Sequence, residues 1–281
     1  MHADAPIGVF DSGVGGLTVV KELTQLLPRE SILYFGDSAR VPYGPKSADT
    51  VRRYSREATA YLCAQGVKLV VVACNTATAY AYEALRSELP VPVVGVIEPG
   101  ARAAIQATRT GRIGVIGTAG TIRSGAYDFA VRELLPDARV YAQACPLFVP
   151  IVEEGWSTHQ VAELAAREYL QPLHDVDIDV LILGCTHYPL LKPLIAQIMG
   201  ARVTLVDSAA ETASEVQETL AAQHLLTSRT EAGALRFSAS DSPLRFREVG
   251  RRFLGDIVRD VQHVDVEGFA DLDRERRVKQ G

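Results

Sequence analysis

Short apolar segments rich in β-branched residues recur along the chain, and each is followed by an amphipathic stretch long enough to form a helix. The pattern predicts strands at 7–10, 32–35, 69–73, 93–96, 113–116, 140–142, 180–183 and 203–206. Such alternation of strands and helices is typical of βαβ units and parallel sheets. Because the segments are almost entirely apolar, we expect helices to cover both faces of each sheet.

The sequence also contains an internal repeat. Residues 7–13, Ile-Gly-Val-Phe-Asp-Ser-Gly, resemble residues 113–119, Ile-Gly-Val-Ile-Gly-Thr-Ala, and residues 72–76 resemble residues 183–186. In each half, a later strand ends at a cysteine, 67 positions after Ile7 and 72 positions after Ile113. The repeat predicts an α/β fold of two similar doubly wound, mainly parallel lobes, related by pseudo-two-fold symmetry and with the active site between them.

The expected first lobe is discontinuous. It takes residues 1–97 and 208–270, and the second lobe takes residues 98–207, because the residues after 206 are too few for a third domain of typical size. The sequences Ser-Thr-His-Gln at 157–160 and Ser-Ala-Ala-Glu at 208–211 resemble capping boxes and predict helix starts there. Residues 271–281 are charged and poor in apolar residues, so we expect a frayed charged tail.

The composition is that of an ordinary globular protein. The 281 residues carry a formal net charge of −5, and 47% of them are hydrophobic, which is enough to fill a buried core. No large cluster of Lys and Arg lies outside the last residues, which disfavours nucleic acid or an anionic membrane as a partner. The start lacks a basic region followed by a long apolar stretch, and the most apolar run, 67–74, is too short to span a bilayer. We therefore expect a cytoplasmic protein that acts on a small molecule.

Four widely spaced cysteines, with no Cys-x-x-Cys pair, are expected to be free thiols in a reducing compartment. Cys63 lies within a helical pattern and Cys145 precedes a proline. A buried cysteine behaves mainly as a small apolar residue, so we expect these two to be structural.

Cys74 and Cys185 lie at strand ends, where open α/β sheets bind their ligands. The positive end of the following helix favours the thiolate at such a position. The alternative is that both are packed core cysteines. The residues after them are polar, namely Asn75, Thr76, Thr186 and His187. Buried core positions would leave those polar groups unsatisfied, so a chemical role is favoured.

The turn Asp-Ser-Gly-Val-Gly-Gly at 11–16 follows the first predicted strand and precedes a helix expected from Leu17. Its backbone donors suit an anion such as a phosphate or a carboxylate. It lacks the G-x-G-x-x-G order and a following G-K-[ST], which disfavours a nucleotide. Asp11 could meet an ammonium group or polarise a thiol; the alternative role is a helix N-cap.

Three further positions are ambiguous on spacing alone. The loop at 36–45, which contains Tyr43 and Gly44, could line a site or be an ordinary turn. His187 could tune the Cys185 thiol as a Cys–His partner. Glu153 and its neighbour Glu154 are typical of a solvated helix face.

Taken together, these residues resemble the glutamate racemases, which are cofactor-independent amino-acid racemases of the aspartate/glutamate racemase family. The resemblance covers nearly the whole chain. It rests on IGVFDSGVGGLTV at 7–19, YFGDSARVPYG at 34–44, ACNTAT at 73–78, GVIEPG at 95–100, IGVIGTAGTIRS at 113–124, CPLFVPIVEEG at 145–155, GCTHYPLL at 184–191 and LVDSA at 205–209. Several long motifs in this order are far more specific than a single pattern.

The resemblance implies a two-base reaction. Cys74 and Cys185 are implied to be acid/base thiols on opposite faces of the substrate α-carbon, Cys74 taking the proton from D-glutamate and Cys185 taking it from L-glutamate. Asp11 and His187 are implied to assist them, with Glu153 supporting the histidine. The implied substrate-binding residues are Asp11, Ser12, Tyr43, Gly44, Asn75, Thr76, Thr118, Thr121, Thr186 and His187.

The resemblance also implies a biological setting: D-glutamate for peptidoglycan, cell-wall biogenesis and cell shape, made in the cytoplasm. The chemistry is consistent with this, because racemisation removes a proton from one face of the α-carbon and returns one to the other. We expect no cofactor, no metal, no nucleic acid and no membrane partner. A homodimer remains open.

Three other functions remain to be weighed. A zinc hydrolase could use Cys74, Cys185 and His187 as ligands, although closely spaced ligand pairs are the usual pattern. An aspartate-specific racemase would use the same chemistry as the glutamate enzyme. A two-lobed module that only binds a small molecule would show saturable binding without exchange of the α-hydrogen.

Overall fold

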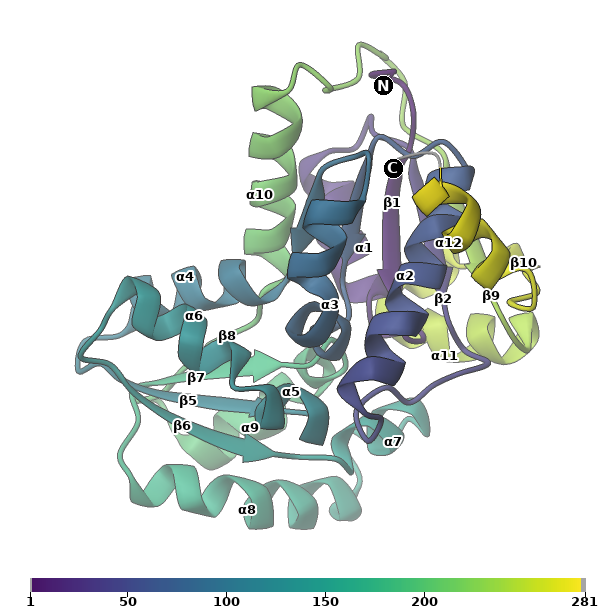
Figure 1. The fold of residues 1–281 in the computed structure, drawn as a ribbon. Helices are drawn as coiled ribbons and strands as arrows, with labels where there is room; N and C mark the ends of the chain where they lie inside the picture. The colour runs from purple at the N-terminus through teal and green to yellow at the C-terminus, as the bar shows by residue number, and fades with distance from the viewer. Residues whose placement is uncertain (1, 279–281) are drawn as a thin grey trace.

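The computed structural model describes residues 2–278 as two parallel sheets, each packed between helices (Figure 1). The first sheet has the strand order β10-β9-β2-β1-β3-β4. Its strands are β1 (Ile7–Asp11), β2 (Ile32–Gly36), β3 (Leu69–Val72), β4 (Val93–Gly95), β9 (Leu235–Ala239) and β10 (Val261–His263). All neighbouring strands pair in parallel. The prediction of a parallel α/β fold is thereby confirmed.

The second sheet repeats the central part of the first. Its strands are β5 (Arg112–Gly117), β6 (Arg139–Ala144), β7 (Val180–Gly184) and β8 (Thr204–Val206). The order β6-β5-β7-β8 places the second, first, third and fourth strands of this half side by side, as β2-β1-β3-β4 does in the first sheet. The internal repeat is therefore a repeat of topology. All eight predicted strands are present, with ends within two residues of the predicted positions.

Helices cover both faces of the first sheet. On one face lie α1 (Leu17–Leu26), α10 (Ala209–Ala222) and α11 (Pro243–Leu254), and on the other lie α2 (Ala48–Ala64), α3 (Asn75–Glu88) and α12 (Phe269–Val278). Successive side chains of a strand point to opposite faces. Val9 accordingly packs in the cluster of Leu17 and Val216, whereas Phe10 packs with Leu62. This two-sided burial explains why the strand sequence is continuously apolar.

The second sheet is covered in the same way. One face is covered by α4 (Ile97–Ala107) and α6 (Ala126–Leu134), and the other by α8 (Gln160–Asp175) and α9 (Lys192–Met199). Four short elements complete the structure: α5 (Ala119–Ser124), α7 (Phe148–Glu153), η1 (Tyr188–Leu191) and η2 (Gly255–Ile257). Helix α5 packs against α3, so elements of the two sheets meet there.

The chain passes from one sheet to the other twice, between β4 and α4 and between β8 and α10. The first turn of α4 packs closely against the second connection, because a Cβ at Gly100 would lie 3.2 Å from Ser208 Cβ. We call the two units of sheet and helices the first and second lobes. Boundaries at 1–97 with 208–270, and at 98–207, remain our proposal for them.

The C-terminal segment differs from the expected frayed tail. Residues 269–278 form α12, and Phe269 is 2% exposed, with its ring 5.0 Å from that of Tyr61 and 5.4 Å from that of Phe35. Arg276 donates to the Glu88 carbonyl oxygen at 2.6 Å. One buried aromatic ring and a hydrogen-bonded arginine therefore hold a helix whose sequence is otherwise polar. The rest of the expected tail, 279–281, lies outside the described residues.

Neither predicted capping box forms. Helix α8 begins at Gln160, and its N-cap is His159, whose Nδ1 accepts a hydrogen bond from the Val161 amide at 3.2 Å. Helix α10 begins directly after Ser208, as expected, but that side chain makes no capping bond. The imidazole takes the role that the sequence pattern assigned to a serine hydroxyl.

A buried ion pair lies at the amino ends of the central strands, far along the strands from the cysteines. Lys68, fully buried, donates to Glu30 and to the carbonyl oxygens of Ala3 and Leu225, the last at 2.8 Å. Glu30 also accepts from the Thr227 amide at 2.8 Å.

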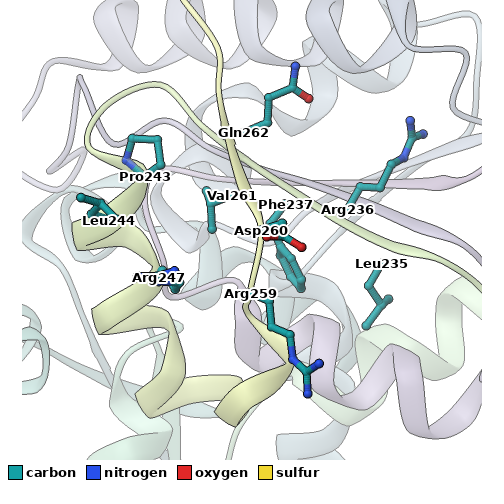
Figure 2. A pocket seen from close by; sticks show the side chains of 10 residues that line it. All are labelled: Leu235, Arg236, Phe237, Pro243, Leu244, Arg247, Arg259, Asp260, Val261 and Gln262. Carbon is teal, nitrogen blue, oxygen red and sulfur yellow. The ribbon is translucent and has the colours of Figure 1, made fainter.

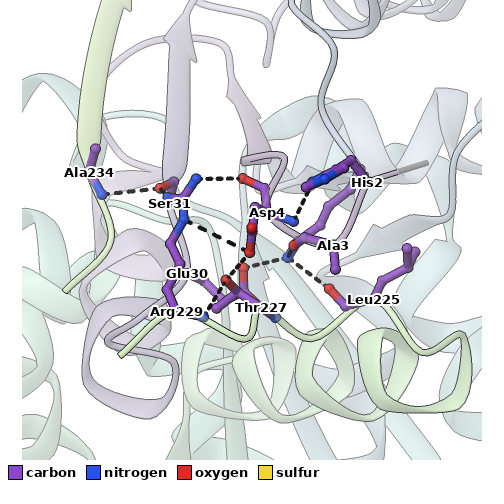
Figure 3. A network of polar contacts seen from close by, with 10 residues as sticks. His2, Ala3, Asp4, Glu30, Ser31, Leu225, Thr227, Arg229 and Ala234 are labelled. Carbon is purple, nitrogen blue, oxygen red and sulfur yellow. Dashed lines mark hydrogen bonds and ion pairs between the residues drawn. The ribbon is translucent and has the colours of Figure 1, made fainter. Parts of the chain in front are cut away.

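Neighbouring contacts attach the N-terminal segment to the stretch before β9 (Figure 3). Thr227 Oγ1 donates to Asp4 Oδ1 at 2.6 Å, and Arg229 donates to the Asp4 carbonyl oxygen at 3.0 Å. The N-terminal segment and the segment at 225–229 thus converge on the Lys68–Glu30 pair. The pair therefore fastens β1, β2, β3 and β9 together at their amino ends.

Replacing Lys68 with Met should strongly destabilise the protein, because it leaves the Glu30 carboxylate buried without its charge partner. We expect a loss of about 3–5 kcal/mol in the free energy of unfolding, measured by urea denaturation. The control is Arg167→Met, which breaks the exposed pair between Arg167 and Glu163 and should cost at most about 0.5 kcal/mol. Equal effects of the two substitutions would contradict a structural role for the buried pair.

Candidate active site

The two predicted catalytic thiols occupy equivalent places in the two lobes. Cys74 follows β3 and Cys185 follows β7, and each of these is the third strand of its half. Both residues are 6% exposed, and the charge of Cys185 raises the pKa of Cys74. A Cβ at Gly15, in the turn after β1, would lie 2.1 Å from Thr186 Oγ1. The carboxyl edges of the two sheets therefore meet, and they bring the two thiols into one site.

Cys74 is the N-cap of α3. Its sulfur accepts from the Ala77 amide at 3.4 Å and its thiol lies 3.5 Å from Ser12 Oγ. Burial and the charge of Asp11 nevertheless raise its pKa to about 12, although the Ser12 and Ala77 contacts oppose the rise. The start of α3 does favour the thiolate, as expected, but burial and Asp11 outweigh it, so Cys74 is a neutral thiol at pH 7.

Asp11 ends β1 and is 1% exposed. One carboxylate oxygen accepts from the Gly13 amide at 2.8 Å, and the other has no hydrogen-bond partner among the described residues. Burial raises the pKa of Asp11, although the nearby His187 opposes the rise. The N-cap of α1 is Gly16, so the alternative role of Asp11 as a cap is wrong. That oxygen is a buried acceptor whose hydrogen-bonding capacity is unused.

Cys185 belongs to a chain of polar groups. Its sulfur lies 4.0 Å from His187 Nδ1, and His187 Nε2 lies 2.9 Å from Glu153 Oε1 at the end of α7. Burial by itself would lower the pKa of His187, but the contacts with Cys185 and Glu153 outweigh it and raise the pKa to about 10. His187 is therefore an imidazolium at neutral pH, and it lies beside the Cys185 sulfur.

Glu153 is held from both lobes. Burial would raise its pKa, but His187, Arg245 and Arg252 lower it overall. Arg252 of α11 donates to the Glu153 carbonyl oxygen, and Arg245 donates to Glu154 at 2.9 Å. Spacing alone assigned Glu153 to a solvated face; the structure places it against the histidine.

Three threonine hydroxyls join the lobes. Thr76 Oγ1, at the start of α3, lies 2.8 Å from Thr118 Oγ1 and 3.2 Å from Thr121 Oγ1. Thr118 and Thr121, at the start of α5, are 3.0 Å apart. A hydroxyl can donate one hydrogen bond and accept others, so the cluster can direct donors toward an anion.

The loop after β2 also reaches the second lobe. A Cβ at Gly44 would lie 2.8 Å from Thr118 Cβ, and one at Gly120 would lie 2.8 Å from the Gly44 carbonyl oxygen. The neighbouring Tyr43 is 1% exposed and its hydroxyl donates to Asp37. The loop is thus more than an ordinary turn, because its backbone packs against the start of α5.

Two residues near the site were not identified from the sequence. Asp37 is fully buried and accepts from Arg40, Tyr43 and Ser240, so it anchors the loop after β2. Its position directly after a strand was the available signal. Tyr127 of α6 donates to Asn75 Oδ1 at 2.7 Å, and no sequence signal distinguished it from a core tyrosine.

The other two cysteines, Cys63 and Cys145, pack in the hydrophobic cores. Cys145 is buried in the core that contains α7 and α8, and its pKa is raised by burial. Cys63 packs half-buried on α2, and burial raises its pKa to about 11. Both remain thiols, as expected of packing residues.

Two pockets lie near α11. A small one, of about 150 Å³, includes Gly13, Val41, Glu153 and Arg245 in its lining and so borders the predicted site. A larger one, of about 460 Å³, lies between β9, β10 and the start of α11, and none of the predicted site residues lines it (Figure 2).

Within residues 2–278, no three His, Cys, Asp or Glu side chains are grouped so as to hold a metal ion. In that range no helix combines the length and the apolar character needed to cross a bilayer.

Comparisons with known proteins agree with this arrangement. The family described as Asp/Glu/Hydantoin racemase matches residues 7–216. A glutamate racemase of Geobacter metallireducens is 56% identical over 261 residues, which cover 93% of this chain and 97% of that protein.

Solved structures are similar over the same length. The crystal structure of a glutamate racemase isoform from Bacillus anthracis matches with a TM-score of 0.91 at 44% identity, covering 94% of this chain and 98% of that one. A glutamate racemase from Francisella tularensis in complex with D-glutamate matches with a TM-score of 0.89 at 39% identity, covering 95% and 99%.

Replacing Glu153 with Gln should lower the pKa of His187 from about 10 toward the ordinary value of 6.5, because a carboxylate that stabilises the imidazolium is lost. Titration of the imidazole by nuclear magnetic resonance measures this directly. The control is Glu154→Gln, which breaks an ion pair with Arg245 and should leave the His187 titration unchanged.

The same shift predicts a stability change with pH. The pKa of His187 is raised in the folded state, so the stabilisation is fully present below about pH 6.5 and is lost as the pH rises through about 10. A His187 that titrates near 6.5 in the unmodified protein would contradict the imidazolium assignment.

Proposed function

Because the chain belongs to the Asp/Glu/Hydantoin racemase family, we propose that it interconverts L-glutamate and D-glutamate by two-base proton transfer at the α-carbon. The observation that supports this most is the meeting of Cys74 and Cys185 at equivalent strand ends of two repeated lobes. The similar proteins described above are glutamate racemases, and one of them holds D-glutamate. An aspartate-specific racemase is therefore not favoured.

In the direction from L to D, Cys185 acts as the base. Its sulfur, which acts as the thiolate in this step and has the His187 ring beside it, takes the α-proton, and the electron pair of the broken C–H bond delocalises into the substrate carboxylate. Cys74, a neutral thiol, then donates its proton to the opposite face of the carbon. The reverse direction exchanges the two roles, with Asp11 beside Cys74.

The ammonium group and the carboxylate of the substrate are bound by different groups of the site. The unpartnered oxygen of Asp11 receives the ammonium group. The substrate carboxylate gains negative charge in the transition state, and the donors of Asn75 and of the threonine cluster bind it. Ser12, Thr186 and the backbone of Tyr43 and Gly44 complete the site. Preorganised donors of this kind stabilise the developing carbanion most where water is excluded.

The proposed setting is the cytoplasm, where the D-glutamate serves peptidoglycan synthesis. The reaction as derived uses only groups of this chain, and no step requires a cofactor. A homodimer is the assembly to test, by light scattering of the purified protein.

Purified protein without added pyridoxal phosphate or metal should racemise either glutamate isomer, because both proton-transfer groups belong to the chain. The measurement is loss of optical rotation, with L-aspartate as the substrate control. A colourless preparation that is inactive but recovers on addition of pyridoxal phosphate or a metal would overturn the proposal. Saturable glutamate binding without exchange of the α-hydrogen would favour the binding module instead.

Replacing either Cys74 or Cys185 with Ala should abolish net racemisation, since no proton can then be delivered to one face. In heavy water, Cys74→Ala should retain slow deuterium uptake into L-glutamate, and Cys185→Ala should retain it into D-glutamate, as followed by nuclear magnetic resonance. Cys63→Ala is the matched control and should turn over normally. Equal uptake into both isomers by either single variant would contradict the two-base assignment.

A further inference from the structure

Tyr127 touches the residue beside each thiol. Its ring passes Gly184, the residue before Cys185, so closely that a Cβ at Gly184 would lie 2.9 Å from the ring. Its hydroxyl donates to Oδ1 of Asn75, the residue after Cys74, at 2.7 Å. A single side chain from α6, only 3% exposed, thus bridges the two thiol-bearing turns.

The Tyr127 hydroxyl also lies at the junction of the two inter-lobe connections. A Cβ at Gly100, on α4 just after the first connection, would be 3.3 Å from the Tyr127 hydroxyl oxygen and 3.2 Å from Ser208 Cβ, which belongs to the second. Burial raises the pKa of the Tyr127 phenol, and a contact from the Ser208 side chain opposes the rise. The phenol is therefore neutral and keeps its proton for Asn75.

This contact fixes how the Asn75 amide is turned. Its oxygen is occupied by Tyr127, whereas its nitrogen has no hydrogen-bond partner within the described part of the chain and is not among the buried unpaired atoms found there. That nitrogen therefore reaches solvent, although Asn75 as a whole is only 3% exposed. An amide that could rotate freely would present its oxygen as often as its nitrogen.

We propose that Tyr127 is a positioning residue for the racemase reaction: it locks the Asn75 amide with its NH₂ group toward the substrate carboxylate. The proposal rests on the proposed function, and it extends that function to a residue that does not touch the substrate. An Asn75 amide oxygen turned toward the substrate carboxylate would repel it. Loss of the Tyr127 hydrogen bond therefore weakens both substrate binding and transition-state stabilisation.

The test is Tyr127→Phe, which keeps the ring against Gly184 and removes only the hydroxyl. We expect kcat/KM for glutamate to fall about ten- to a hundredfold, as for a misoriented binding group. The dissociation constant of D-glutamate, measured by calorimetry, should rise at least about tenfold. The control is Tyr188→Phe: Tyr188 is fully buried in the same lobe and donates to the Cys145 carbonyl oxygen at 2.8 Å.

Tyr127→Phe loses the hydrogen bond to Asn75 and the Ser208 contact, and Tyr188→Phe loses one buried hydrogen bond, so both melting temperatures should fall. Only Tyr127→Phe should lose activity and affinity. A double-mutant cycle makes the assignment specific: in an Asn75→Ala background, Tyr127→Phe should cause no further loss of kcat/KM. Equal losses for Tyr127→Phe and Tyr188→Phe, or additive effects in the cycle, would overturn the proposal.

The two readouts separate this proposal from the proposed function. A protein that racemises glutamate while Tyr127→Phe behaves as the unmodified protein refutes only the role of Tyr127. A protein that does not racemise but binds D-glutamate in a Tyr127-dependent way refutes the proposed reaction and supports the positioning role. Absence of both turnover and binding refutes both.

Discussion

The contact between the turn at Gly15 and the second-lobe turn at Thr186 and His187 sets the width of the site. A Cβ at Gly15 would lie 2.1 Å from Thr186 Oγ1 and 2.5 Å from His187 Nδ1, so a larger residue there would have to displace these two side chains. Parallel strands bring all their carboxyl ends to one edge of a sheet, and this contact presses two such edges together. Cys74 and Cys185 lie at these two edges, directly after β3 and β7.

The repeat makes the two halves alike in topology and different in charge. In the aligned segments, Asp11 of the first half corresponds to Gly117 of the second, so only Cys74 has a buried carboxylate beside it. Cys185 instead has His187. Two equivalent positions thus become a neutral thiol and a sulfur beside an imidazolium, which suits a reaction needing an acid and a base at once.

The sequence predicted well the features that depend on local pattern. Continuous apolar runs located eight strands, and polar residues after two of them located both thiols, since burial on two faces leaves little choice of side chain. It missed β9 and β10, because Leu-Arg-Phe-Ser-Ala at 235–239 and the three residues of β10 at the sheet edge form no continuous apolar run. It missed α12 because the buried ring of Phe269 and the hydrogen bond of Arg276 hold that otherwise polar helix.

The sequence also could not predict electrostatic effects between residues that are far apart in the chain. A thiolate at Cys74 was expected from its helix terminus, but the opposing effects of burial and Asp11 depend on contacts between residues far apart in the chain. The contact of Glu153 with His187 could not be predicted from spacing for the same reason, because only the fold places α7 against His187.

The high pKa of Cys74 has a consequence for how the enzyme would begin the D to L direction. Cys74 must lose its proton to act as a base, yet burial and Asp11 both disfavour the thiolate. An ammonium group bound at the unpartnered oxygen of Asp11 would compensate the carboxylate charge and add a positive charge near the sulfur. Opposite charges at such distances favour the ionised form of a thiol. The substrate that needs the base would therefore itself help to create it, and the thiol would stay neutral and unreactive until the substrate binds.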